Sequence, residues 1–178
     1  MKATRLLLAA MVLGAAIDAS QANAQCSSNS GSCNTTNTAS VTVGALVKLA
    51  MSSAATTLTA PSVTDIESAL SLDDVGPTFT IKANRSWTLK VKSQNATNFT
   101  YAGSDAGVKP ISDLSWATSS GGAYSAITGS DATFASGASS NSTAAAAFFR
   151  TSWAGGFSAA SNAPGTYTLP IVFTLTAP

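Results

Sequence analysis

The last fifteen residues, "PGTYTLPIVFTLTAP" (164–178), alternate apolar and polar side chains and decide the fold class. Successive side chains of a β-strand point to opposite faces of a sheet, so this pattern predicts a half-buried strand. Pro170 cannot donate a backbone hydrogen bond, which predicts an edge position or a bulge. The apolar face of the predicted strand comprises Tyr167, Leu169, Ile171, Phe173 and Leu175.

A second alternating stretch, "VTVGALVKLAM" (41–51), lies near the other end of the chain. Its apolar face includes Val41, Val43, Val47 and Leu49. We expect this strand to pair with the closing strand, which would join the two ends of the domain. The alternative is that one of these terminal strands pairs with another subunit at an exposed sheet edge.

Short alternating stretches separated by turn residues fill the chain between these two strands. Residues 79–82 and 87–92 are examples, and together such stretches predict about seven to nine strands. Thr64 followed by Glu67 has the spacing of a helix capping box. The expected fold is therefore all-β: an antiparallel Ig-like β-sandwich with one short helical turn.

The first residues have the pattern of an export signal. Lys2 and Arg5 precede an apolar stretch over 6–17, and Ala22-Asn23-Ala24 has the form of a cleavage site. The alternative is an uncleaved N-terminal anchor. With cleavage, we expect a secreted, periplasmic or cell-surface protein. The predicted organisation is a signal peptide over 1–24, a flexible polar leader over 25–38 and a β-sandwich domain over 39–178.

The two cysteines, Cys26 and Cys33, both lie in the polar leader. Exported proteins meet oxidising conditions, so we predict a disulfide between them. A metal or redox site is disfavoured because the spacing is wrong and the chain has no histidine.

Composition argues against several classes of function. A chain without histidine has no Ser-His-Asp or Cys-His machinery. Of nine Lys/Arg and eight Asp/Glu, the segment 1–24 holds Lys2, Arg5 and Asp18, so seven of each sign remain. A neutral mature chain disfavours nucleic acid and acidic membranes as partners. No later stretch is apolar enough to span a membrane, so none is expected after signal cleavage.

Carboxylates are the remaining candidates for chemistry. A hydrolase would need two facing carboxylates, for which Asp105, Asp113 and Asp131 are available. The cluster over 65–74 could hold calcium, but it lacks the spacing of a known calcium loop. We therefore expect no enzyme, no cofactor and no bound metal.

The polar exported leader, the first alternating strand, the Ser/Thr/Ala-rich body and the final Gly165-x-Tyr167-x-Leu169 strand resemble secreted bacterial pilin-like or adhesin-like Ig-type domains. That resemblance implies a structural or adhesive cell-surface protein, a self-associating pilin-like subunit whose partners are its own copies or other surface subunits. The alternative function is a carbohydrate- or cell-envelope-binding module, with Trp153 beside two glycines as the expected glycan contact.

Overall fold

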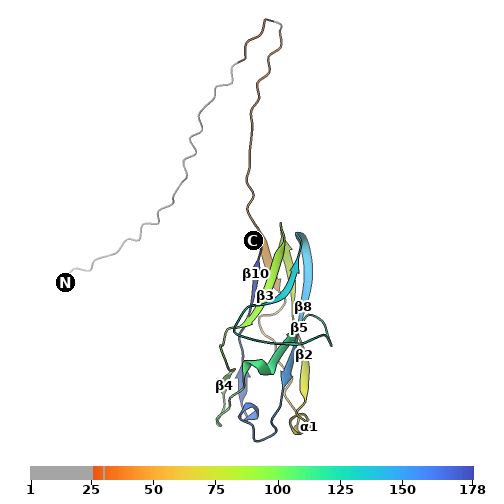
Figure 1. The fold of residues 1–178 in the computed structure, drawn as a ribbon, viewed down its shortest axis with the longest axis vertical. Coiled ribbons are helices and arrows are strands. Elements are labelled where there is room, and N and C mark those ends of the chain that lie inside the picture. The colour runs from red at the N-terminus through yellow and green to blue at the C-terminus, as the bar shows by residue number, and fades with distance from the viewer. Residues whose placement is uncertain (1–25, 30) are drawn as a thin grey trace, which may run out of the picture. The chain divides into compact units, whose positions relative to one another are not determined.

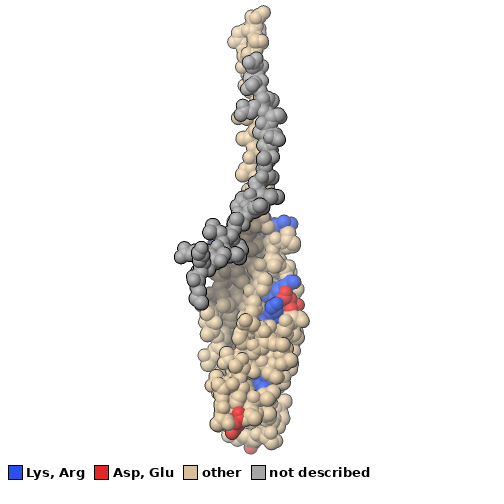
Figure 2. Space-filling model, turned by 90° about the vertical axis from the view of Figure 1, so that its left-hand side faces the viewer, with Lys and Arg blue, Asp and Glu red and all other residues tan. Residues whose placement is uncertain are grey.

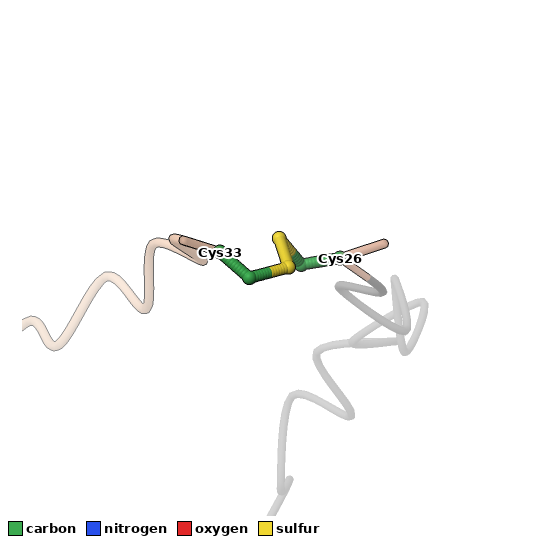
Figure 3. Close-up of a disulfide and its surroundings, with 2 residues drawn as sticks. All are labelled: Cys26 and Cys33. Atoms are coloured by element: carbon green, nitrogen blue, oxygen red, sulfur yellow. A yellow bond between two sulfur atoms is a disulfide. The ribbon is translucent and has the colours of Figure 1, made fainter. Parts of the chain in front are cut away.

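The computed structural model describes residues 26–29 and 31–178, so the predicted signal peptide lies outside the described residues. The chain divides into two units, residues 1–42 and residues 43–178. The described residues of the first unit are exposed and contain no helix or strand. Cys26 and Cys33 form the predicted disulfide there (Figure 3).

The second unit, which we call the body, is built almost entirely from antiparallel strands. Strands make up 42% of the described residues and helices 7%, so the all-β prediction is confirmed. The described residues form ten strands, more than the seven to nine expected. The strands are β1 (Val47–Met51), β2 (Ser71–Ala83), β3 (Trp87–Ser93), β4 (Thr100–Ala102), β5 (Leu114–Ala117), β6 (Ser125–Ala126), β7 (Ala132–Gly137), β8 (Ser140–Ser152), β9 (Thr166–Thr168) and β10 (Ile171–Thr176).

These strands form three sheets in the body. The largest has the order β1-β2-β8-β5-β6, a second has the order β10-β3-β7, and β4 pairs with β9 alone. β2 and β8 are the longest strands and run antiparallel, with Ser71 opposite Ser152 and Ala83 opposite Ser140. In Figure 1 the C-terminus lies at one end of the body, and α1 and β4 lie at the opposite end.

The core lies between the five-stranded and three-stranded sheets. In β3, Trp87, Leu89 and Val91 are buried, because alternate side chains of the strand face the same way. They meet Phe79 and Ile81, which are buried on β2. Each side chain of this size contributes about 1.5–3 kcal/mol when it leaves water. The two sheets are therefore held together by one apolar layer.

The helical turn is present but shifted from its predicted cap. α1 spans Val63–Glu67, and Ser62 rather than Thr64 is its N-cap. The Ser62 hydroxyl accepts a hydrogen bond from the Asp65 backbone, and Asp65 in turn accepts one from the Ser62 backbone. Aspartate can complete a capping box as glutamate does. Within the described part of the chain, two short 3-10 helices, η1 (Ile111–Asp113) and η2 (Ala160–Asn162), are the other helical segments.

Candidate strand-addition groove

β1 and β10 are each an outer strand of a sheet, and they belong to different sheets. β1 pairs only with β2, where Val47 lies opposite Ala83. β10 pairs only with β3, where Thr176 lies opposite Thr88. The predicted pairing of the first strand with the closing strand is therefore wrong. β1 pairs instead with β2 and β10 pairs with β3, two strands of different sheets, and a groove is lined by residues of β1 and β10.

This groove runs between β1 and β10 at the end of the body that carries the C-terminus. Ala45 and Val47 line one side, and Leu175, Thr176 and Ala177 line the other. Thr88 and Lys90 of β3 and the terminal Pro178 also line it. An edge strand presents a row of backbone donors and acceptors that another strand can pair with. An extended segment could thus pair with one of these edges. Where Cα atoms of β1 and β10 lie within 8 Å of each other, no strand fits between the two edges.

The apolar side chains beside the groove are incompletely covered. Leu49, Phe173 and Leu175 are half-buried and pack against the core. Val47 remains 45% exposed. The sequence pattern alone suggests that the apolar face of the closing strand is wholly buried, yet all five of its large side chains stay half-buried. A further strand in the groove would remove this apolar surface from water.

The chain that leads into β1 is extended and exposed. The predicted strand begins at Val41, but β1 begins at Val47. Val41 is 88% exposed and Val43 is 68% exposed, and no strand is formed over 31–46. We call residues 34–43 the N-terminal arm. Within the arm, residues 39–43 alternate apolar and polar side chains, and they have no partner strand among the described residues.

Asn84 fixes the point at which this segment joins the body. Its side-chain amide donates a hydrogen bond of 2.8 Å to the Gly44 carbonyl. Its side-chain oxygen accepts one of 2.8 Å from the Leu46 backbone. Both bonds reach across about forty residues of sequence, so no local pattern predicts them. Asn84 therefore fixes the backbone at Gly44 and Leu46, and the arm precedes this fixed point in the sequence.

The remaining residues of the closing stretch divide between two sheets. Pro170 lies in the connection between β9 and β10 and in neither strand, whereas the sequence predicted an edge position or a bulge within one strand. Ile171 lies in β10 opposite Ser93, whereas Tyr167 lies in β9 opposite Tyr101. Leu169 is half-buried between the two strands. Tyr167 and Leu169 thus support the core away from the groove.

Tyr167 sits in a partly apolar environment. Its hydroxyl donates a hydrogen bond of 2.9 Å to the Ala163 carbonyl. Burial raises the pKa of Tyr167 above its usual value, and the neighbouring Tyr101 raises that pKa further. The hydroxyl therefore keeps its proton throughout the neutral range and acts as a structural donor.

Trp153 is less accessible than the sequence suggests. The residue is half-buried, and the ammonium of Lys109 lies 4.1 Å from the centroid of its ring. The indole nitrogen is buried. One face of the ring is therefore occupied by a cation from the same chain. The glycan contact at Trp153 stays a prediction, for which only the opposite face is left.

Two of the three carboxylates considered for a hydrolase, Asp113 and Asp131, form ion pairs. Asp113 lies 3.1 Å from the Lys109 ammonium, and Asp131 lies 3.2 Å from that of Lys92. In the cluster considered for calcium, Asp73 pairs with Arg150 and Asp74 accepts hydrogen bonds from Thr59. No group of three potential metal ligands occurs among residues 26–29 and 31–178. The four aspartates thus act as structural acceptors in the body.

Within the described part of the chain, no helix is long and apolar enough to cross a membrane. Neither a protein-family model, nor a curated protein, nor a solved structure matches this chain.

Proposed function

We propose that this chain is an exported, non-enzymatic structural or adhesive subunit with an Ig-like β-sandwich body. Its copies self-associate at the cell surface when the N-terminal arm of one copy adds a strand to the groove of another. The single observation that carries this proposal is the groove beside the outer strands β1 and β10, in a chain whose exposed arm forms no strand among the described residues. The pilin-like resemblance of the sequence points to the same activity.

The arm has the chemistry that such a groove requires. Val41 and Val43 share one face, and burying each contributes about 1.5–3 kcal/mol. Each backbone hydrogen bond formed with an edge adds about 0.5–1.5 kcal/mol. Ordering the arm costs about 1–2 kcal/mol per residue, so the valines must enter the groove for association to be favourable.

The arm is also long enough for the groove. Ten extended residues span about 33 Å, and the five residues of β1 span about 17 Å. The arm can therefore cover the whole free edge of β1 and still cross from one body to the next.

The proposal is tested with paired substitutions in the mature chain from Gln25. Val41→Asp/Val43→Asp places charges on the face that enters the groove, and we expect oligomers to disappear in sedimentation velocity. Thr42→Asp is the matched control, because its side chain points to the opposite face of the same strand. Oligomers that survive the valine substitutions would rule out arm insertion.

Cross-linking identifies the groove directly. A copy with Val43→Cys is mixed with a copy carrying Ala177→Cys, and we expect a disulfide between the two copies after mild oxidation. Thr166→Cys, on the exposed side of β9 outside the groove lining, is the control acceptor. Equal cross-linking to both acceptors would contradict insertion at this groove.

A further inference from the structure

The stretch over 39–51 has an apolar pattern that is the same when it is read in either direction. Every second residue is apolar, and the midpoint of the stretch is Ala45. The apolar residues are Ala39, Val41, Val43, Ala45, Val47, Leu49 and Met51. A two-fold axis places each residue of an antiparallel strand opposite the residue equally far from the axis. Two copies of this stretch can therefore pair with an apolar residue opposite every apolar residue.

The outer edge of β1 has the backbone groups that such a pair requires. The Asn84 backbone donates a hydrogen bond of 3.2 Å to the Leu46 carbonyl, so Leu46 faces β2. Alternate residues of a strand direct their N–H and C=O groups to opposite sides. Val47 and Leu49 therefore direct theirs to the outer edge, where no further strand lies within the described part of the chain. The apolar positions of the stretch are thus also the positions whose backbone is free to pair.

The arm joins the body beside the groove. The arm ends at Val43, and Ala45 and Val47 line the groove. The terminal Pro178 also lines it, so the groove and the start of the arm lie at the same end of the body. An arm therefore reaches the groove of another copy when the same ends of the two bodies face each other.

We propose that two copies exchange their arms reciprocally about a two-fold axis, with Ala45 of one copy opposite Ala45 of the other. This inference rests on the proposed arm insertion and specifies the partner strand, the register and the size of the assembly. Val43 of each copy then lies opposite Val47 of the other copy. Val41 likewise lies opposite Leu49. An isologous contact of this kind uses both arms and both outer edges, so the assembly closes as a dimer.

Reciprocal exchange strengthens a contact that is weak for one arm alone. Val41, Val43 and Val47 are exposed in the single chain, and the paired strands place all three on the face that lines the groove. Once one arm has paired, the second arm and the second edge already lie close together. The second pairing is then intramolecular and occurs at a high effective concentration.

The direction of the strands selects β1 as the partner. β1 runs away from the groove end of the body, from Val47 to Met51, whereas β10 runs toward this end and finishes at Thr176. An arm from the facing copy runs toward the same end, because it leaves the groove there. The arm is thus antiparallel to β1 and parallel to β10, and antiparallel pairs are slightly more stable. It adds outside β1 and extends the five-stranded sheet without separating β1 from β10.

The arm is not positioned to pair with β1 of its own chain. That pairing would require the chain to reverse direction over residues 44–46. A three-residue hairpin loop usually contains a residue in the left-handed conformation, and none of residues 44–46 has a positive φ. Asn84 also holds the backbone on both sides of Ala45, through its bonds to Gly44 and Leu46. The arm is therefore available to a second copy.

Charge contributes little to this contact. Lys48 is the only charged residue in the sequence over 39–51, and in the paired strands it lies opposite Thr42. The two lysines of the dimer are then six positions apart along the pair, or about 20 Å. This separation exceeds the Debye length of about 8 Å at physiological salt. Figure 2 shows uncharged atoms over most of the visible face of the body. The dimer should therefore persist when the salt concentration is raised.

Sedimentation equilibrium of the mature chain from Gln25 tests whether the assembly closes. We expect monomers and dimers only, with the dimer fraction rising as the protein concentration is raised. The dimers should remain when NaCl is raised from about 0.15 M to about 1 M. Species larger than a dimer would overturn the proposal, because they require an arm and an edge that stay unused at each end. Loss of the dimers at about 1 M NaCl would also contradict an apolar contact.

Cysteine cross-linking tests the register. Opposite residues of a hydrogen-bonded pair have Cα atoms about 5.5 Å apart, which a disulfide can span, so Ala45→Cys should cross-link to itself under mild oxidation. Val43→Cys mixed with Val47→Cys should give a cross-linked dimer as well. Val41→Cys alone is the matched control, because its two copies would lie about 26 Å apart. Peptide mapping by mass spectrometry identifies the bonds. Equal dimer yields for Ala45→Cys and Val41→Cys would contradict the two-fold register.

The Val41→Asp/Val43→Asp variant separates this inference from arm insertion itself. We expect this variant to sediment as a monomer, because charges cannot enter the apolar contact. Dimers that persist in it would refute arm insertion and the reciprocal exchange together. If the variant is monomeric but the unmodified chain forms species larger than a dimer, arm insertion stands and the reciprocal exchange is refuted.

Discussion

The ring of Phe173 in β10 packs against the ring of Phe79 in β2, with centroids 4.5 Å apart. Phe134 of β7 contacts both rings, at 5.4 Å and 5.5 Å. The three residues belong to three strands in two sheets. The apolar side chains of β10 are only half-buried. The aromatic cluster is therefore the contact through which β10 packs against the opposite sheet.

We expect Phe173→Ala to destabilise the body by about 3–5 kcal/mol, because it removes an aromatic side chain from a packed cluster and leaves a cavity. The free energy of unfolding is measured by urea denaturation. Thr174→Ala is the control on the opposite, exposed face of β10 and should change this free energy by less than about 0.5 kcal/mol. Similar losses for both variants would show that the aromatic cluster does not anchor β10.

Tyr101 lies in a space that glycines keep open. Its hydroxyl donates a hydrogen bond of 2.6 Å to the Pro164 carbonyl. A Cβ atom added at Gly107 would overlap the Tyr101 ring. We expect Gly107→Ala to destabilise the body by about 1–3 kcal/mol, since the ring must leave a low-energy position. Thermal unfolding followed by circular dichroism measures this loss.

Two further variants support the interpretation at Tyr101. Gly44→Ala is the control, because a Cβ at Gly44 meets nothing within 4 Å. Adding Tyr101→Ala to Gly107→Ala should make the effect of the glycine substitution smaller, because residues in contact are not additive. A fully additive double mutant would show that the overlap with Tyr101 is not the cause.

The buried side chain of Lys109 makes the free energy of unfolding depend on pH in the alkaline range. Only 1% of the residue is exposed, and burial lowers the pKa of its ammonium below the usual 10.5, although Asp113 opposes the shift. Between the lowered pKa and 10.5 the unfolded chain binds more protons than the folded chain. The contribution of Lys109 to stability therefore rises with pH in this window.

The measurement compares the unmodified chain with Lys109→Met in urea denaturation as the pH is raised toward 10.5. The unmodified chain should gain stability relative to the variant, and tyrosine ionisation cancels because it is common to both. A difference that stays constant with pH would show that the Lys109 ammonium is solvated.

The disulfide belongs to the leader and not to the body. Cys26 and Cys33 close a short loop in the unit that ends at residue 42. We expect reduction to leave the unfolding temperature of the body within about 1 °C, because a cross-link stabilises the segment whose unfolded state it constrains. Calorimetry with and without reductant checks this. A large drop on reduction would mean that the leader and the body unfold as one unit.

Period-two alternation identified strands wherever one face is buried. β3 and β10 lie where the pattern places them, because the inward positions 87, 89 and 91 and 171, 173 and 175 contact the core. Period-two alternation did not identify strands in segments whose composition is typical of loops. β7 and the first residues of β8 consist mainly of small and hydroxyl-bearing residues, a composition that is also typical of loops. Such side chains fit a sheet when their neighbours cover them.

The sequence by itself determined the strand-rich class, the leader disulfide and the absence of histidine chemistry, because these follow from local alternation and residue type. Only the tertiary structure decided which strands pair, where the groove lies and which edge of β1 is free. Those features depend on contacts such as Asn84 with Gly44 and Lys48 with Lys82, which join residues far apart in the chain. Hydrophobic alternation determines which face of each strand is buried, but it does not determine which strand lies beside it.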